Sequence, residues 1–207
     1  DARAAAPIVA AHLAAGRLLA YPTETVYGLG SAPNPGALAG LARLKGRPPR
    51  KPFLLLVSSR LMAEEYGLDF NASARAMADA CWPGPLTLVL PGGEGRLPPE
   101  LRGVEGGIAV RHTSQKEVAL MIKLMGHALT STSANRPGHP TAPGTDGIVA
   151  TFGDAEASGE LLVLDGGVLG NLPPSTLVHC TSPLPRIIRV GAVPRPERRR
   201  MVGRLAP

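Results

Sequence analysis

Three short segments of this chain combine side chains that could bind a small polar substrate or a phosphate. The first, residues 21–30 (Tyr-Pro-Thr-Glu-Thr-Val-Tyr-Gly-Leu-Gly), follows an apolar run and carries Thr23, Glu24 and Thr25 ahead of two glycines. Loops at strand ends are where α/β sheets bind ligands, and the two threonine hydroxyls could donate to or accept from a small substrate. The alternative is a turn whose threonines cap the local backbone and whose Glu24 is a surface acid.

The second segment, residues 45–52, places four cations among prolines that restrict the backbone. The cations are Lys45, Arg47, Arg50 and Lys51. Polyphosphate binding needs positive charge held in place, with Arg donating to two oxygens at once and Lys acting as a point charge. The alternative is a solvated run of charge. Because the segment leads directly into an apolar run at Phe53, the pattern favours phosphate binding.

The third segment, residues 129–138, is a cluster of hydroxyl side chains directly after a short apolar run. Such a loop offers hydroxyl and amide partners to phosphate or to a metal-bound oxygen, although an ordinary Ser/Thr-rich turn has the same composition. The sequence contains neither GxxxxGK[ST] nor GxSxG, so a P-loop NTPase and an α/β-hydrolase are both disfavoured.

Two further arginines stand next to apolar residues. Arg111 directly follows Ile108-Ala-Val, and Arg189 lies within Ile187-Ile-Arg-Val-Gly. A buried or half-buried Arg needs an anionic partner, because an unpaired charge in an apolar environment is costly. That partner is either a ligand or an internal acid such as Asp165.

The overall composition describes a globular, basic protein. The 207 residues carry 22 Lys and Arg against 16 Asp and Glu, a formal net charge of +6, which favours phosphate-bearing partners such as a nucleotide or RNA. No apolar run approaches the roughly 18 residues of a membrane span, and no secretory signal opens the chain, so we expect a cytoplasmic protein. Cys81 and Cys180 lack the spacing of a zinc site or a disulfide scaffold.

Hydrophobic periodicity predicts the elements that must position these side chains. Helices are expected over residues 4–15, from an Asn71 cap toward Cys81, and from a Ser114 cap to Met125. Another helix is expected from near Pro35, with Lys45 and Arg47 at its C-terminal exit before Pro48 and Pro49 stop it. Strands are expected at residues 18–21, 53–57, 86–90, 107–110, 128–130, 161–164, 176–179 and 186–190. Strands and helices alternate, the crossovers suit parallel pairs, and the late strands are close enough for hairpins. We therefore predict one α/β domain with a mixed sheet.

Taken together, the segments resemble the YrdC-like (TsaC-type) family of threonylcarbamoyl-AMP synthases. The landmarks are residues 21–30, the Lys-x-Arg pair at 45 and 47, Trp82-Pro-Gly-Pro-Leu-Thr87, Val110-Arg111, the Ser-x-Asn pair at 133 and 135, Ser175-Thr176 and Arg189. The resemblance spans a catalytic domain over residues 4–193 and leaves residues 194–207 as a basic tail. It implies a twisted sheet of parallel and antiparallel strands, flanked by helices, with a basic concave face. The corner at residues 82–85 is interpreted as structural.

The family resemblance implies a cytoplasmic nucleotidyltransferase. Such an enzyme condenses L-threonine, bicarbonate and ATP to threonylcarbamoyl-AMP and pyrophosphate. Its product feeds the threonylcarbamoyl modification of tRNA adenosine through downstream transfer proteins, and tRNA itself is a possible partner. Mg²⁺ is expected to arrive with ATP, without protein ligands.

The resemblance also assigns roles to residues. The expected catalytic residues are Lys45, Arg47, Ser133 and Asn135. The expected ATP ligands are Lys45, Arg47, Lys51, Ser133, Asn135, Thr141 and Arg189. The expected threonine ligands are Thr23, Thr25, Arg111, Ser131 and Ser175. No general base is identified, and Glu24 is expected to orient its loop.

Two other functions fit the same sequence. A carbamoyl-transfer maturation domain of the same fold would use carbamoyl phosphate within a larger multidomain protein. A non-catalytic module could instead hold double-stranded RNA or tRNA by its phosphates. Because aromatic residues make up only 3% of the chain, stacking on single-stranded bases is disfavoured.

Overall fold

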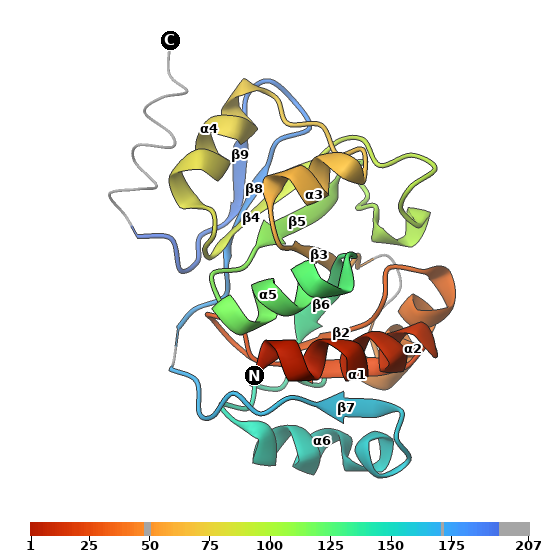
Figure 1. Cartoon of the computed structure of the whole chain (residues 1–207). Coiled ribbons are helices and arrows are strands. Elements are labelled where there is room, and N and C mark those ends of the chain that lie inside the picture. Colours follow the sequence, from red (N-terminus) through yellow and green to blue (C-terminus); the bar gives the residue numbers. More distant parts are fainter. Residues whose placement is uncertain (48–50, 171, 195–207) are drawn as a thin grey trace.

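The computed structural model describes residues 1–47, 51–170 and 172–194 (Figure 1). Pro48, Pro49 and Arg50 lie outside the described residues, as do Asn171 and residues 195–207. The expectations for Arg50, for the prolines that would end the second helix and for the basic tail therefore stay predictions.

One mixed sheet organises the described residues, as the sequence predicts. Its strand order is β7-β1-β2-β6-β3-β5-β4-β8-β9. The pairs β1–β7, β3–β5 and β4–β8 are parallel, and the remaining neighbours are antiparallel. The strands are β1 (Leu18–Tyr21), β2 (Gly28–Gly30), β3 (Leu54–Val57), β4 (Leu86–Leu90), β5 (Ile108–His112), β6 (Leu129–Ser133), β7 (Leu161–Val163), β8 (Thr176–His179) and β9 (Arg186–Arg189).

Helices cover both faces of the part of the sheet formed by β1 and β3. Along β1, Leu18 and Ala20 belong to one apolar cluster while Leu19 and Tyr21 belong to another, because successive strand residues point to opposite faces. Helices α1 and α5 lie side by side on one face (Figure 1). The helices are α1 (Ala2–Ala14), α2 (Pro35–Lys45), α3 (Arg60–Glu65), α4 (Ala72–Cys81), α5 (Lys116–Met125) and α6 (Thr145–Ala157), with a 3₁₀ turn at Pro99–Leu101.

The other half of the sheet leaves one face open. Leu86 and Leu88 of β4 are buried in the cluster that includes residues of α4, whereas Thr87 and Val89, the alternate residues, line a cavity. Ala109 of β5 lines the same cavity. The alternation of side chains along these strands therefore separates a packed face from a ligand-accessible one.

Some elements begin earlier than predicted or on different residues. Helix α1 starts at Ala2, because the Asp1 carboxylate accepts a hydrogen bond from the backbone N–H of Arg3 at 2.8 Å and caps it. Helix α5 is capped by Gln115 rather than by Ser114, since the Gln115 side chain accepts from the Glu117 N–H at 2.8 Å.

Three elements, β2, α3 and α6, are not predicted from the sequence, and each has a physical reason. Strand β2 is Gly-Leu-Gly, a poor strand former, yet a Cβ at Gly30 would lie 2.1 Å from the Thr130 carbonyl oxygen, so the close approach of β6 requires glycine. Helix α3 has six residues, too few for a periodic signal. Helix α6 contains a non-helical Phe152 (φ −130°), which interrupts its periodicity. None of the helices in the described part of the chain is long and apolar enough to cross a membrane.

Candidate active site

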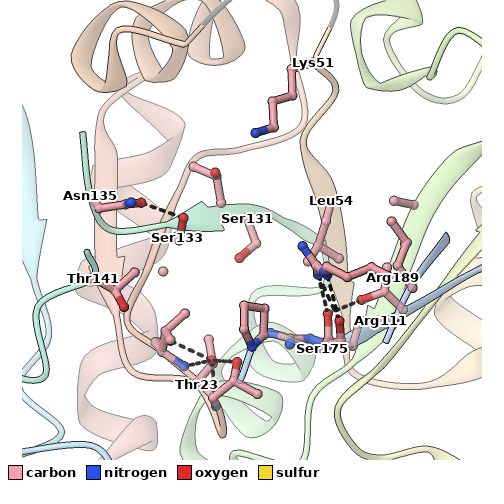
Figure 2. A pocket seen from close by; sticks show the side chains of 18 of the residues that line it. Thr23, Lys51, Leu54, Arg111, Ser131, Ser133, Asn135, Thr141, Ser175 and Arg189 are labelled. Atoms are coloured by element: carbon pink, nitrogen blue, oxygen red, sulfur yellow. Dashed lines mark hydrogen bonds between the residues drawn. The ribbon is translucent and has the colours of Figure 1, made fainter. Parts of the chain in front are cut away.

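The open face of the sheet forms a cavity of about 1060 Å³ (Figure 2). All twelve residues proposed from the sequence line it: Thr23, Thr25, Lys45, Arg47, Lys51, Arg111, Ser131, Ser133, Asn135, Thr141, Ser175 and Arg189. The described lining contains five Lys or Arg residues and one carboxylate, Glu105. Glu105 is itself paired with Arg186 at 2.5 Å and with the imidazole of His179 at 3.1 Å. The cavity is therefore suited to anionic ligands.

Two ends of the cavity differ in chemistry. We define the lysine end as Lys45, Arg47, Lys51, Ser133 and Asn135, and the arginine end as Arg111, Ser131, Ser175 and Arg189. Glu24 lies beside Arg111 but outside the lining. Figure 2 shows Ser133, Asn135 and Thr141 on one side of the cavity and Arg111, Ser175 and Arg189 on the other.

At the lysine end, Lys45 holds the Ser-x-Asn loop. It is the last residue of α2, and the next residue, Gly46, caps the helix in the left-handed conformation (φ 64°). Its buried Nζ donates to the Ser133 carbonyl at 2.5 Å and to the carbonyl and Oδ1 of Asn135 at 2.8 and 2.9 Å. Ser133 Oγ donates to Asn135 Oδ1 at 2.6 Å. Burial, together with the charges of Arg47 and Lys51, lowers the pKa of Lys45 to about 8.

Arg47 holds a second loop at the same end. Its Nε donates to the Lys51 carbonyl at 2.7 Å, and its two Nη atoms donate to Thr132 Oγ1 at 2.8 Å and the Pro52 carbonyl at 2.5 Å. The guanidinium also lies over the Phe53 ring, 4.3 Å from its centroid. Burial lowers the pKa of Arg47 to about 10. The exposed Lys51 side chain extends into the cavity (Figure 2).

At the arginine end, Arg111 is buried and lies beside Glu24. Arg111 Nε and Glu24 Oε1 are 3.7 Å apart, with side-chain exposures of 4% and 13%. Both atoms are buried, and neither has a hydrogen-bond partner in the part of the chain that the structure describes. The acid that faces Arg111 is therefore Glu24, whereas Asp165 accepts from the backbone N–H of Gly167.

Arg189 corrects a prediction, because it is exposed rather than buried among apolar neighbours. Strand β9 is the edge of the sheet, and Ile188 and Val190 are 46% and 64% exposed. The Arg189 guanidinium donates to the Ser175 carbonyl at 2.9 Å from Nη2 and 3.2 Å from Nε. Partial burial, followed by the charge of Arg111, lowers the pKa of Arg189.

The loop that carries Thr23 and Thr25 fits both interpretations left open by the sequence, a capped turn and a ligand-binding loop. Thr23 Oγ1 donates to the Val26 carbonyl at 2.7 Å and accepts from the Thr25 N–H at 3.2 Å, so it caps the local turn. The side chains of Thr23 and Thr25 nevertheless line the cavity. Their hydroxyls are 3.2 Å apart.

The sequence interpretation missed Thr87 and Thr113. The corner at residues 82–85 is structural as expected, since Trp82 Nε1 donates to the Leu86 carbonyl at 2.7 Å. The next residue, Thr87, lines the cavity and shares a hydrogen bond with Ser175 Oγ at 2.8 Å. A polar side chain alternating with Leu86 and Leu88 was the available signal. Thr113 Oγ1 donates to Glu24 Oε2 at 2.5 Å.

Metal ligands do not gather in the described residues: no group of three or more His, Cys, Asp or Glu side chains there could hold an ion. The expectation of Mg²⁺ bound through ATP is not tested by this observation. The twelve predicted ligand roles likewise stay predictions, although the structure brings their side chains to one cavity.

Comparisons with known proteins agree with this geometry. A Sua5/YciO/YrdC family model, described as telomere recombination, matches residues 11–191. The threonylcarbamoyl-AMP synthase of Nitrosococcus oceani is 41% identical over 141 residues, which cover 68% of this chain and 76% of the relative. That of Thiobacillus denitrificans is 38% identical over 175 residues, or 84% of this chain and 90% of the relative.

One solved relative is a complex with an amino acid. The crystal structure of P. abyssi Sua5 complexed with L-threonine superposes with a TM-score of 0.86 at 30% identity and covers 97% of this chain. The match takes in 58% of the Sua5 chain, so the present chain spans less than two thirds of that relative.

Proposed function

The chain belongs to the Sua5/YciO/YrdC family, and we propose that it is a threonylcarbamoyl-AMP synthase. The relatives that carry this name match most of the chain at 38–41% identity. The observation that supports the proposal best is the single cavity with two differently built cationic ends. The reaction must hold a triphosphate and an amino-acid carboxylate together, and each of the two ends would bind one of them.

The lysine end would bind the triphosphate of ATP. Lys45 and Arg47 already donate to protein oxygens, so they would act on the phosphates by their charge and by keeping their loops in place. Lys51 extends into the cavity and would meet a phosphate directly (Figure 2). Ser133, Asn135 and Thr141 would contribute hydrogen bonds, and Arg189 would approach the nucleotide from the opposite wall. This positive charge would stabilise the pyrophosphate as it leaves.

The arginine end would bind L-threonine. Arg111 would pair with its carboxylate, and the hydroxyls of Thr23, Thr25, Ser131 and Ser175 would surround the remaining polar groups. The threonine amine combines with bicarbonate to give a carbamate and water, and a carbamate oxygen then attacks the α-phosphorus as the bond to pyrophosphate breaks. Holding both reactants in one cavity would supply much of the rate enhancement through proximity.

Mg²⁺ would accompany ATP in this proposal. Glu105 is the carboxylate among the described lining residues, and hydrogen bonding to Arg186 lowers its pKa and occupies it. The phosphate oxygens would therefore supply the metal's ligands, together with water. The proposed enzyme would work in the cytoplasm, and downstream proteins would transfer the threonylcarbamoyl group to tRNA.

The test is pyrophosphate release by the purified protein with ATP and Mg²⁺, with and without L-threonine and bicarbonate. We expect release only when both co-substrates are present, and mass analysis should find threonylcarbamoyl-AMP. A folded protein that releases no pyrophosphate but binds double-stranded RNA with a steep salt dependence would support the RNA-binding alternative instead. Turnover of carbamoyl phosphate would support the maturation-domain alternative.

A further inference from the structure

An ion pair behind the arginine end lacks the hydrogen bond that would normally complete it. Arg111 Nε and Glu24 Oε1 lie 3.7 Å apart, beyond the roughly 2.7–3.2 Å of an N–H···O hydrogen bond. Both atoms are buried without a partner among the described residues. Buried polar groups are nearly always satisfied in folded proteins, so this pair needs an explanation.

Thr113 holds the Glu24 carboxylate in its place. The Thr113 side chain is fully buried, and its Oγ1 donates to Glu24 Oε2 at 2.5 Å while accepting from the Gln115 N–H at 3.2 Å. Gln115 caps the start of α5, so the hydroxyl is anchored to a helix end. The carboxylate is therefore held from the side of α5, and not by Arg111.

The charges around Arg111 leave one positive charge uncompensated. Arg189 carries a second positive charge near Arg111 and donates to the Ser175 carbonyl, while Glu24 supplies one negative charge. Burial lowers the pKa of the adjacent His112, which favours its neutral form. Two guanidinium groups therefore stand near one carboxylate, and a carboxylate ligand on Arg111 would compensate part of this excess positive charge. A guanidinium already hydrogen-bonded to Glu24 would meet that ligand less readily.

We propose that Thr113 is a positioning residue that keeps Arg111 available to the substrate. The Thr113 hydroxyl keeps the Glu24 carboxylate too far from Arg111 for a hydrogen bond. The buried guanidinium therefore retains a nearby counter-charge without forming a hydrogen-bonded salt bridge with it. Without the hydroxyl, Glu24 would move onto Arg111, form a charge-assisted hydrogen bond and compete with the amino-acid carboxylate. This inference rests on the proposed function, in which Arg111 binds threonine.

The test compares Thr113→Val with the parent enzyme in steady-state kinetics. We expect KM for L-threonine to rise about tenfold, which corresponds to about 1.4 kcal/mol, while kcat and KM for ATP stay within about twofold. Thr113→Ser, which keeps a hydroxyl, should restore KM. Thr151→Val removes a hydroxyl that bonds to the Gly147 carbonyl in α6, away from the cavity, and should change nothing.

The decisive control is the double variant Glu24→Gln/Thr113→Val measured against Glu24→Gln alone. A neutral amide cannot form the closed ion pair, so the effect of Thr113→Val on KM for L-threonine should disappear in this background. An effect of equal size in both backgrounds, or a loss of kcat and of ATP affinity in Thr113→Val, would overturn the proposal. If Thr113→Val does not fold, Thr113→Ala provides the same comparison.

Failure of this inference differs from failure of the proposed function. A parent protein that makes threonylcarbamoyl-AMP while Thr113→Val has an unchanged KM for L-threonine would overturn the role of Thr113 alone. A parent protein that neither binds L-threonine in a calorimetric titration nor makes the product would overturn both.

Discussion

The lysine end and the arginine end of the cavity are built on opposite principles. At the lysine end, Lys45 and Arg47 each donate several hydrogen bonds to protein oxygens, so their positions are determined before any ligand arrives. At the arginine end, Arg111 is buried but keeps an unsatisfied nitrogen beside Glu24. The first arrangement shapes loops and supplies an electrostatic field, whereas the second leaves hydrogen-bonding capacity for a ligand.

Removing Lys45 should have the largest effect, because it takes away both a charge and the support of the Ser-x-Asn loop. We expect Lys45→Ala to lower kcat/KM for ATP by about 10³-fold, in line with the loss of a preorganised electrostatic group, while the protein stays folded. Steady-state kinetics and circular dichroism would check this. Near-normal turnover would remove the lysine end from the mechanism.

Removing Arg111 should affect the opposite substrate. We expect Arg111→Ala to raise KM for L-threonine by about 10²-fold, since a charge-assisted carboxylate contact is worth about 1.5–3 kcal/mol, and to leave KM for ATP nearly unchanged. Initial rates with each substrate varied in turn would measure both constants. A larger change in the ATP constant would mean that the two ends are assigned the wrong way round.

Raising the pH should weaken the lysine end selectively. The pKa of Lys45 is about 8, so the charged form that attracts phosphate is present below pH 8 and is lost as pH rises through that value. Calorimetric titration with ATP, without threonine, should show affinity falling roughly tenfold between pH 7.5 and pH 9.5. Lys45→Arg, which stays charged, should show a flatter profile, and an equally steep one would assign the titration to another group.

Removing Lys51 should have the smallest effect. Because its side chain is exposed, its charge is screened by solvent, and contacts of this kind contribute about 0.2–1 kcal/mol. We expect Lys51→Ala to raise KM for ATP by about fivefold or less, as measured in the same assay. An effect as large as that of Lys45→Ala would mean that direct contact, rather than loop support, dominates this end.

Local patterns in the sequence predict the candidate site well where one segment determines the position of a side chain. Lys45 and Arg47 stand at the C-terminal exit of α2, as the sequence predicts, although the cap of the helix is Gly46 and not a proline. The Ser-x-Asn pair stands at the end of β6, with Ser133 as the last strand residue and Asn135 just beyond it. Most strands also follow from their apolar runs, because burial between helices leaves a clear signal.

Contacts between segments that are distant in the sequence cannot be predicted from local sequence patterns. Thr113 is 89 residues from Glu24, and Thr132 is 85 residues from Arg47, so neither hydrogen bond has a local signature. The exposure of Arg189 depends on β9 lying at the sheet edge, which its own apolar sequence does not reveal. Strand β2 forms only because β1 and β6 pair with it on either side.

The central claim is that one cavity binds two different anions at its two ends. Calorimetric titrations of Lys45→Ala and Arg111→Ala, each with Mg-ATP and separately with L-threonine, test it most directly. The account predicts that Lys45→Ala loses ATP binding and keeps threonine binding, and that Arg111→Ala shows the reverse. Equal loss of both ligands in both variants would contradict the division of the cavity into two ends.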